Sequence, residues 1–572
     1  MAIKLYKHQI LILVFILIVL ISGINWGLPN QNRLDLLISN SDITDRQLEL
    51  ISKDRKEYYE RLNKLKDQRL KNFKEGKQID FFSKPKIGNN QPILSQKKKR
   101  TWFRDYILGS SAVDERKAYS ALSQMNINNF DFELKTLYGG AYVYPIGILI
   151  YFLKSLGYIE ITKDLSKYVE SPQYISRMYV CGRILNVLAL FGTLLLLVIL
   201  GNYFYGFACG TTAMLIYAFS PYPLNHSVVS KPHVYASFWI MFGLFLLIRY
   251  HINRKNFTLI LSAVCCGLGS GSIYPSVICL IMYPVLLFDN ENKQQSLKLI
   301  TKPIIISIIV IFMTNPYFLI NPLSNWLKFL YVGSANGLDY LFSINRLYKY
   351  LSLCFCVSIC FPFGVLGLFF SFKEISGKDS LIKRLCVLFL SWLLILILFL
   401  PNVRVSIFIL PLLCVITSFG MYQFLSQMKY SRQISIVLFI PGLIFFTIFS
   451  YCTIYHDRHY ESMKEWTETI KPDDRIGFFE TISPVNMPAF PFLNRTMINM
   501  KFFNKIDKNL LPLYIVIGNY SRKKPQKWHQ LSIDKYYQLI KICGMPFSNS
   551  FLKNFINMNQ SRKAIYIYKK RN

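Results

Sequence analysis

The sequence predicts a polytopic α-helical membrane protein that ends in a small α/β soluble domain. Its 572 residues are 52% hydrophobic and only 17% charged, which is more apolar than most soluble domains. The apolar residues also gather in runs of about twenty, the length that an α-helix needs to cross a bilayer. After residue 455 these runs give way to short β-like segments bounded by turns. A soluble fold for the whole chain is therefore excluded.

Eight apolar runs form the cores of predicted membrane spans: Ile10–Ile24, Val187–Leu200, Val234–Ile248, Ile304–Met313, Leu351–Phe370, Leu385–Leu400, Ile407–Phe424 and Ile434–Ser450. Threading the basic loops alternately between the two sides of the membrane gives about 11–13 transmembrane helices. Gly140–Leu156 does not fit this alternation. It is either a juxtamembrane segment, broken near Pro145, or a sign that a further span exists.

The basic residues at the N-terminus set the orientation. Lys4 and Lys7 precede a span without a clear small-residue cleavage site, so we expect an uncleaved helix that starts in the cytoplasm. The chain then divides into a first transmembrane helix (1–25), a long outer loop (26–137), a transmembrane core (138–455) and a soluble outer domain (456–572).

The two polar parts carry local signals. In the loop, Asp45 marks a helix start, and the residues that follow predict a charged surface helix lying on the protein or on lipid headgroups. The Lys97–Arg100 run is typical of a linker. In the tail, three apolar runs predict strands, whereas Ile533–Ile542 is compatible with a helix. The three runs are Arg475–Phe479, Leu513–Gly518 and Ala564–Tyr568.

The net charge of +34 has two competing explanations, attraction to anionic lipid or phosphate and simple compositional drift. No nucleic-acid-binding motif accompanies the charge, so we expect no nucleic acid partner. The twelve cysteines lack zinc-site spacing with partner histidines, and we predict no metal ligands among them.

Asp114 and Glu115 form an acidic pair at the far end of the polar loop, just before the chain becomes apolar. A carboxylate held against a bilayer is costly to keep charged, which marks the pair as a candidate functional site. The alternative is a solvated helix start, where two acids favour the helix dipole. Asp35 is a rival acidic residue nearer the first span.

Candidate cations and polar groups follow in the outer turns. His226, Lys231 and His233 lie in a proline-rich turn, where a histidine alone is most often a cap or a core residue. Asn315 and Tyr317 end a helix against prolines, and Arg404 starts a late span, where its alternative role is to reach lipid headgroups. Carboxylates and cations together suit transfer from a lipid-linked phosphate donor, because a base activates the acceptor and cations stabilise the leaving phosphate.

The order of these motifs resembles that of the integral-membrane glycosyltransferases of the C-type fold, in the bacterial branch near the protein O-mannosyltransferases and the aminoarabinose transferase. The shared features are Gly27-Leu28-Pro29, the acidic pair, a Tyr/Pro-rich run in Tyr138–Tyr151, Gly182-Arg183, the His-containing turn, Asn315-Pro316-Tyr317, and Arg404 before Pro411. The resemblance covers about Ala112 to Gly420. It implies the C-type glycosyltransferase fold in the bacterial inner membrane.

The resemblance also implies roles for these residues. Asp114 would be the catalytic base and Glu115 its partner or an acceptor contact; Arg183, His226, Lys231, His233, Asn315, Tyr317 and Arg404 would bind the donor. Ala112-Val113 replaces a His-Pro common in relatives, and Lys231-Pro232-His233 stands where many carry an Asp. That second difference puts a divalent cation, which the resemblance allows as a cofactor, in doubt.

The implied partners are a polyprenyl-phosphate sugar donor, membrane lipids and an acceptor that is a glycan, a lipid or a protein. The implied reaction is an inverting transfer at the outer face. Two other functions remain open, a lipid-linked glycan flippase or transporter and an O-antigen-type polymerase or ligase. The chain shows no internal repeat of the kind that transporters carry.

Overall fold

The computed structural model divides the chain into two compact units. Unit 1 comprises Met1–Ile24, Lys117–Tyr151 and Val180–Ile454, and unit 2 comprises Asn25–Arg116, Phe152–Tyr179 and Tyr455–Asn572. The long loop after the first helix and the C-terminal tail therefore belong to one unit. The structure describes residues 5–38, 44–74, 93–112, 114–125, 138–289, 291–320, 322, 361–373, 378–399, 407–426, 443–444, 446, 458–479, 482–484, 487, 489–500, 511–518, 536–543 and 565–571.

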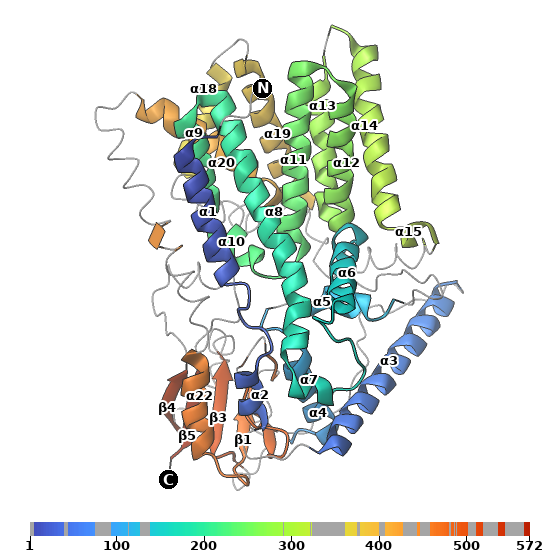
Figure 1. The fold of residues 1–572 in the computed structure, drawn as a ribbon, viewed down its shortest axis with the longest axis vertical. Coiled ribbons are helices and arrows are strands. Elements are labelled where there is room, and N and C mark those ends of the chain that lie inside the picture. The colour runs from blue at the N-terminus through green and yellow to red at the C-terminus, as the bar shows by residue number, and fades with distance from the viewer. Residues whose placement is uncertain are drawn as a thin grey trace. The chain divides into compact units, whose positions relative to one another are not determined.

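Unit 1 is helical (Figure 1). Its described helices are α1 (Lys7–Ser22), α5 (Arg116–Leu122), α6 (Gly140–Ser155), α8 (Gln173–Tyr205), α9 (Phe207–Ala218), α10 (Pro221–Ser227), α11 (Pro232–Asn253), α12 (Asn256–Ser272), the 3-10 helix η2 (Tyr274–Ile281), α13 (Met282–Leu287), α14 (Lys293–Thr314), α15 (Tyr317–Ile320), α18 (Phe361–Lys373), α19 (Lys378–Phe399) and α20 (Leu410–Leu425). Three helix segments belong to unit 2 instead: the first residue of α5, the end of α6 from Phe152, and the start of α8 up to Tyr179. Helices α11, α12 and α14 pack side by side.

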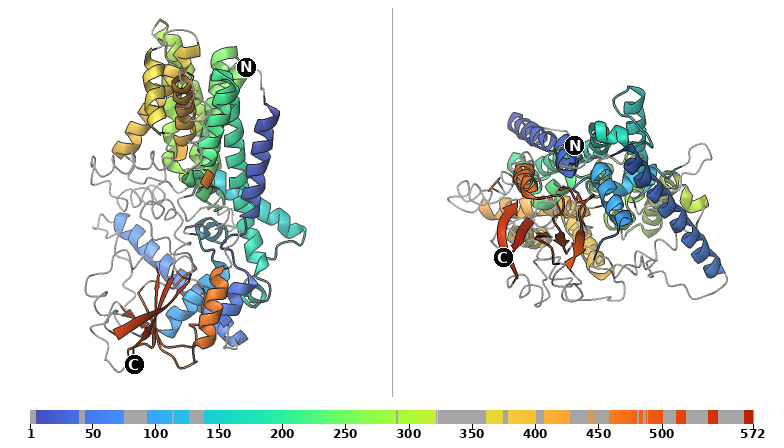
Figure 2. Two further views of the ribbon diagram at one scale, coloured as in Figure 1. Left: turned by 90° about the vertical axis from the view of Figure 1, so that its left-hand side faces the viewer. Right: turned by 90° about the horizontal axis from the view of Figure 1, so that it is seen from below.

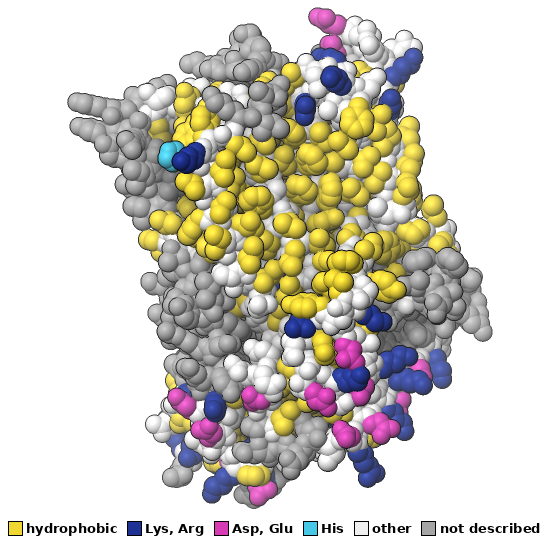
Figure 3. All heavy atoms as spheres, in the orientation of Figure 1, with side chains coloured by type: hydrophobic (Ala, Val, Ile, Leu, Met, Phe, Trp, Pro, Cys, Tyr) yellow, Lys and Arg dark blue, Asp and Glu magenta, His cyan; other side chains and the backbone are white. Residues whose placement is uncertain are grey.

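Three of the described helices are long and apolar enough to cross a membrane, namely α8, α11 and α14. In α14 only 17% of the apolar window is buried by the rest of the protein, and Ile305, Ile309 and Met313 lie exposed. Figure 3 shows a broad apolar surface over the long helices of unit 1. Exposure of so large an apolar surface to water would be unfavourable, so this protein is a membrane protein. The predicted count of 11–13 spans stays a prediction, since Ile434–Ser450 and much of Leu351–Phe370 lie outside the described residues.

Polar side chains fix how helices meet inside unit 1. The fully buried Gln9 amide on α1 donates to Asn202 Oδ1 and Thr211 Oγ1, both at 3.0 Å, and the Asn202 amide donates back to Gln9 Oε1 at 3.0 Å. Such a reciprocal amide pair ties α1 to α8 and α9, because an unpaired amide would be costly in an apolar environment.

One of the two alternatives for Gly140–Leu156 included a break near Pro145, and the structure contradicts that break. Helix α6 continues through Pro145. A proline lacks the backbone N–H and normally costs a helix one hydrogen bond. Here the buried side chains of Tyr142, Val143 and Ile146 pack around that turn, which favours one unbroken helix.

Unit 2 combines helices with a five-stranded sheet. Its helices are α2 (Gln31–Ile38), α3 (Asp45–Lys74), α4 (Gln96–Leu108), α7 (Ser166–Glu170) and α22 (Arg458–Thr469). Its strands are β1 (Ile476–Phe478), β2 (Met497–Asn499), β3 (Tyr514–Gly518), β4 (Tyr537–Cys543) and β5 (Ile565–Lys570), in the order β2-β1-β3-β5-β4. Strands β2, β1 and β3 are parallel, and β5 runs antiparallel to both β3 and β4. Figure 2 shows the twisted sheet with α22 alongside.

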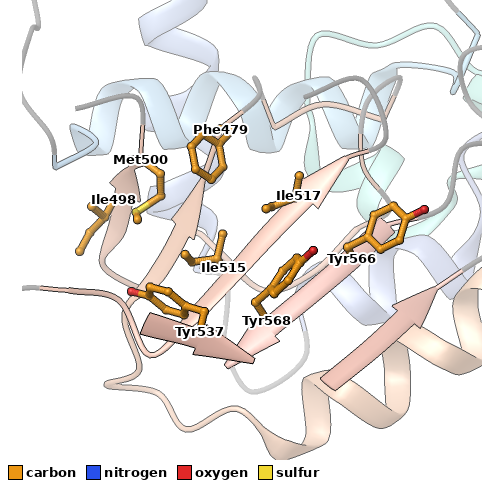
Figure 4. Close-up of a cluster of buried hydrophobic side chains, with 8 residues drawn as sticks. All are labelled: Phe479, Ile498, Met500, Ile515, Ile517, Tyr537, Tyr566 and Tyr568. Atoms are coloured by element: carbon orange, nitrogen blue, oxygen red, sulfur yellow. The ribbon is translucent and has the colours of Figure 1, made fainter. Parts of the chain in front are cut away.

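One face of this sheet carries a core of eight buried side chains (Figure 4): Phe479, Ile498, Met500, Ile515, Ile517, Tyr537, Tyr566 and Tyr568. Ile515 pairs with Tyr568 across the sheet, and Ile517 pairs with Tyr566. Residues two apart in a strand point to the same face, so these cross-strand pairs stack into one apolar layer. The predicted α/β character of the tail and its three predicted strands are confirmed.

Two predictions in unit 2 are wrong. The residues of Ile533–Ile542 are compatible with a helix, but Tyr537–Cys543 forms strand β4. Its Leu, Gln and Lys residues favour a helix locally, yet β5 offers a hydrogen-bonding edge, and the Tyr537 hydroxyl donates to the Pro512 carbonyl at 2.8 Å. The tertiary contact therefore overrides the local preference. The sequence also gave no signal for β2.

The second error concerns Lys97–Arg100, which belongs to helix α4 rather than to a linker. Trp102 and Tyr106 of that helix pack on Phe478 and Phe492 of the tail, with ring centroids 5.3 and 5.8 Å apart. Burial of this aromatic face stabilises the helix, although its lysine-rich start does not predict one. The predicted helix at Asp45 is confirmed as α3.

Lys99 of α4 is a buried cation. It is 3% exposed, and its ammonium donates to the Arg495 carbonyl at 2.9 Å. Burial lowers the pKa of Lys99 to about 8, because the charged form loses hydration. An unfolded lysine titrates near 10.4, so between about pH 8 and 10.4 the unfolded chain binds more protons at this site. The contribution of Lys99 to stability therefore rises with pH in that window.

We expect Lys99→Met to stabilise unit 2 at about pH 7 by roughly 1–2 kcal/mol, because a linear apolar side chain replaces a buried charge. The advantage should shrink toward about pH 10, where the folded wild type holds a neutral amine. Thermal unfolding in detergent at both pH values measures this difference. Lys98→Met, at an exposed neighbouring position, is the matched control. An advantage that does not change with pH would contradict the assignment.

Candidate functional site

The acidic pair lies between α4 and α5 in an unusual backbone conformation. Asp114 has a φ of 66°, in the left-handed region. Aspartate adopts this region only occasionally, although more readily than most residues other than glycine. Glu115 follows with a side chain that is 0% exposed, and α5 begins at the next residue. A buried carboxyl group and a strained aspartate in succession are features that cluster at functional sites.

Arg33 holds the segment that leads into this pair. Its guanidinium donates to the Gly109 carbonyl at 2.7 Å, to the Gly27 carbonyl at 2.8 Å and to Ser111 Oγ at 2.9 Å. The Ser111 amide also donates to the Gly27 carbonyl at 2.8 Å. The Gly27-Leu28-Pro29 motif is thereby fastened to the chain three residues before Asp114.

Gly27 is required at this position for two reasons. Its φ is +64°, and a Cβ there would lie 2.9 Å from the Cβ of Ser111. A side chain would therefore be strained and would push the two segments apart. The sequence motif thus has a local structural cause inside unit 2.

We expect Arg33→Lys to loosen this segment, because one ammonium cannot reproduce the planar fork that reaches three acceptors. The loss of about two hydrogen bonds should lower stability by roughly 1–3 kcal/mol. The measurement is hydrogen exchange of the Ser111 amide, which should accelerate at least about tenfold, as a loss of 1.4 kcal/mol implies. Arg46→Lys, at an exposed position on α3, is the control. Unchanged exchange at Ser111 would show that Arg33 does not hold the loop.

Asp35, the rival acidic residue, lies exposed on α2 and accepts a hydrogen bond from Gln31 Nε2 at 2.9 Å. This i, i+4 contact is an ordinary surface interaction on a helix. Asp35 therefore lacks both the burial and the backbone strain that mark the acidic pair.

Three of the candidate binding residues in unit 1 lie at the connection between α10 and α11. His226 and His233 are each 6% exposed, Lys231 is 7% exposed, and the two imidazole rings meet edge to face with centroids 5.5 Å apart. His226 Nδ1 lies 3.0 Å from the Tyr222 carbonyl. A carbonyl only accepts, so Nδ1 carries the proton in this contact.

Helix α8 holds this connection in place. The buried Asn186 amide donates to the carbonyls of Val229 at 2.6 Å and Lys231 at 2.8 Å. One turn earlier lies Arg183, which is 0% exposed and donates to the Ile24 carbonyl at 2.8 Å. The structure therefore brings the helix that carries Arg183 against the turn that carries Lys231, within unit 1. Sequence reasoning missed Asn186, because a single asparagine in an apolar helix gives no signal of its partner.

Asn315 and Tyr317 form a second polar cluster of unit 1. Asn315 Oδ1 accepts from the Gly140 amide at 2.8 Å and from the Tyr317 hydroxyl at 2.7 Å. Its Nδ2 donates to the carbonyls of Gly271 and Ile311 at 3.1 and 2.9 Å. The amide thus joins the start of α6 to the ends of α12 and α14. Direct contact of Asn315 with the sugar donor stays a prediction. The structure shows Asn315 joining three helices.

Helix α6 connects the two clusters, since Gly140 binds Asn315 and Tyr142 contacts Ser230 beside Lys231 at 3.0 Å. Arg404 lies outside the described residues. The acidic pair and its rival Asp35 belong to unit 2, and the described candidates for binding the sugar donor belong to unit 1. Among the residues that the structure describes, no three His, Cys, Asp or Glu side chains group as a metal site.

Comparison with known proteins gives no sequence match, either to a family model or to a curated protein. Several solved structures match this chain at low TM-scores. The enzyme ArnT from Cupriavidus metallidurans, bound to undecaprenyl phosphate, is 8% identical with a TM-score of 0.44, over 79% of this chain and 93% of that one.

Two further structures are similar. The oligosaccharyltransferase AglB from Archaeoglobus fulgidus, in complex with an inhibitory peptide and a dolichol-phosphate, is 11% identical with a TM-score of 0.42, over 76% of this chain and 69% of that one. The mycobacterial arabinofuranosyltransferase AftD is 11% identical with a TM-score of 0.36, over 80% of this chain and 37% of that one. These neighbours are glycosyltransferases of the C-type fold, the class that the sequence motifs resemble. At such low scores the likeness assigns no activity by itself.

Proposed function

We propose that this protein is a membrane glycosyltransferase that transfers a sugar from a polyprenyl-phosphate-linked donor to an acceptor at the outer face of the bacterial inner membrane. The observation that carries the proposal is the buried cation Lys231, flanked by His226 and His233, inside a unit of apolar helices. A cation at low exposure in a membrane protein is costly and usually marks a site for an anion or a proton. A phosphate that bridges membrane and water would offset that cost.

In this proposal the donor phosphate is bound by the cations. Lys231 and Arg183 supply positive charge, and His226, His233 and Arg404 supply further hydrogen bonds. Tyr317, whose hydroxyl donates to Asn315, contacts the sugar or its phosphate. Cations fixed before the reaction stabilise the charge that develops on the phosphate as it leaves.

The acidic pair acts on the acceptor. A carboxylate oxygen of Asp114 takes the proton from an acceptor hydroxyl, and the acceptor oxygen attacks the anomeric carbon of the sugar. The bond between that carbon and the phosphate oxygen breaks, the bonding electrons leave with the polyprenyl phosphate, and the configuration inverts. Glu115 orients the base or contacts the acceptor.

A reconstituted transfer assay tests this function. Purified protein in nanodiscs is mixed with polyprenyl-phosphate sugars and an envelope extract from a deletion strain, and released polyprenyl phosphate is quantified. We expect release that depends on both the protein and the extract. No release with any donor, together with a deletion strain that accumulates lipid-linked sugar on one leaflet, would favour a flippase. Glycans of altered chain length would favour a polymerase or ligase.

A further inference from the structure

Three helices of unit 1 converge on one buried hydroxyl group, that of Ser230. The Tyr119 hydroxyl on α5 donates to Ser230 Oγ at 2.9 Å, and the Tyr142 hydroxyl on α6 lies 3.0 Å from the same atom. On α8, Gly182 passes so close that a Cβ there would lie 2.0 Å from Ser230 Oγ. Ser230 itself is 0% exposed. A single serine thus sets the spacing of three elements.

The same turn is also held through its backbone by Asn186 of α8. Asn186 binds the carbonyls on both sides of Ser230, and the Lys231 amide donates back to the Val229 carbonyl at 2.8 Å. The backbone that presents Lys231 is therefore fixed by the hydrogen bonds from Asn186 to the Val229 and Lys231 carbonyls and by the contacts of the Ser230 side chain. This matters because a lysine side chain has several rotatable bonds and can place its charge only as well as its Cα is held.

We infer that Ser230, together with Tyr119, is a positioning residue for the donor phosphate, acting through the turn that presents Lys231. The inference rests on the proposed function, because it takes Lys231 as a ligand of the donor. Tyr119 follows Asp114 by only five residues, on the helix that begins directly after the acidic pair. The Tyr119–Ser230 hydrogen bond therefore anchors that helix to the turn that presents Lys231.

A binding experiment with two lipids tests this role. Undecaprenyl phosphate and undecaprenol are titrated into protein in nanodiscs. The dissociation constant of undecaprenol divided by that of undecaprenyl phosphate reports the phosphate-dependent part of the affinity. We expect Lys231→Met to lower this ratio more than tenfold. Ser230→Ala and Tyr119→Phe should each lower it about three- to tenfold. The double variant should resemble Ser230→Ala, because that change already removes the Tyr119 hydrogen bond, together with the contact to Tyr142.

Tyr537→Phe is the control, because it removes a buried tyrosine hydrogen bond in unit 2 and should leave the ratio unchanged. If Ser230→Ala keeps the ratio within about twofold while Lys231→Met lowers it, the positioning role is refuted and the proposed function stands. If Ser230→Ala weakens both lipids equally and lowers the melting temperature, Ser230 serves the fold alone and the inference also fails. If Lys231→Met changes nothing, the proposed donor site itself is wrong.

Discussion

Replacing Asp114 by Asn is expected to lower the rate of sugar transfer about 10²–10⁴-fold, the usual contribution of a general base. The acceptor hydroxyl would no longer find a carboxylate to take its proton. Asparagine is the right replacement, because it has nearly the same shape and also tolerates the left-handed backbone that Asp114 adopts. Alanine would add backbone strain of roughly 1–2 kcal/mol and confuse the two effects.

Asp35→Asn is the matched control for this experiment. Asp35 is the rival base, and it lies exposed on a helix of the same unit. The measurement is turnover at saturating donor, with donor binding and melting temperature recorded for each variant. Asp114→Asn should bind undecaprenyl phosphate like wild type. Normal turnover by Asp114→Asn would refute its role as the base, and a loss confined to Asp35→Asn would transfer the role to Asp35.

Replacing Gly182 by Ala is expected to destabilise unit 1 by roughly 3 kcal/mol through overpacking. The added Cβ would lie 2.0 Å from Ser230 Oγ and 2.7 Å from the Tyr119 hydroxyl, and both neighbours are held by hydrogen bonds. Alanine otherwise favours a helix over glycine by about 1 kcal/mol, so any net loss shows that the site has no room. Thermal unfolding in detergent measures the effect.

A compensating substitution makes this prediction specific. In Gly182→Ala with Ser230→Ala, the nearest obstacle is gone, and the next atoms are the Tyr119 hydroxyl oxygen and the Ser230 Cβ, at 2.7 and 2.9 Å. The double variant should therefore lose less stability than the sum of the two single variants. Strict additivity would mean that the Gly182–Ser230 contact is not what limits the packing.

Local sequence patterns were reliable where one element sets its own structure. The helix at Asp45 and the strands near Ile515 and Ile567 follow from residue spacing and from β-branched and aromatic composition. They were wrong at α4 and β4, where the deciding partner is distant in sequence. Trp102 packs on Phe478, and Tyr537–Cys543 pairs with β5, so contacts that no local window contains chose the structure.

The sequence by itself determined that this is a membrane protein with an α/β tail, and it drew attention to Asp114, Glu115 and Lys231. The physical reason is that long apolar runs are most stable inside a bilayer, whereas charged residues beside them are most stable at its surface. Only the tertiary structure decided which polar groups meet. Gly182 has no room for a side chain because Ser230 lies against it, and Gly27 has none because Ser111 lies against it. The order of residues along the chain predicts neither contact.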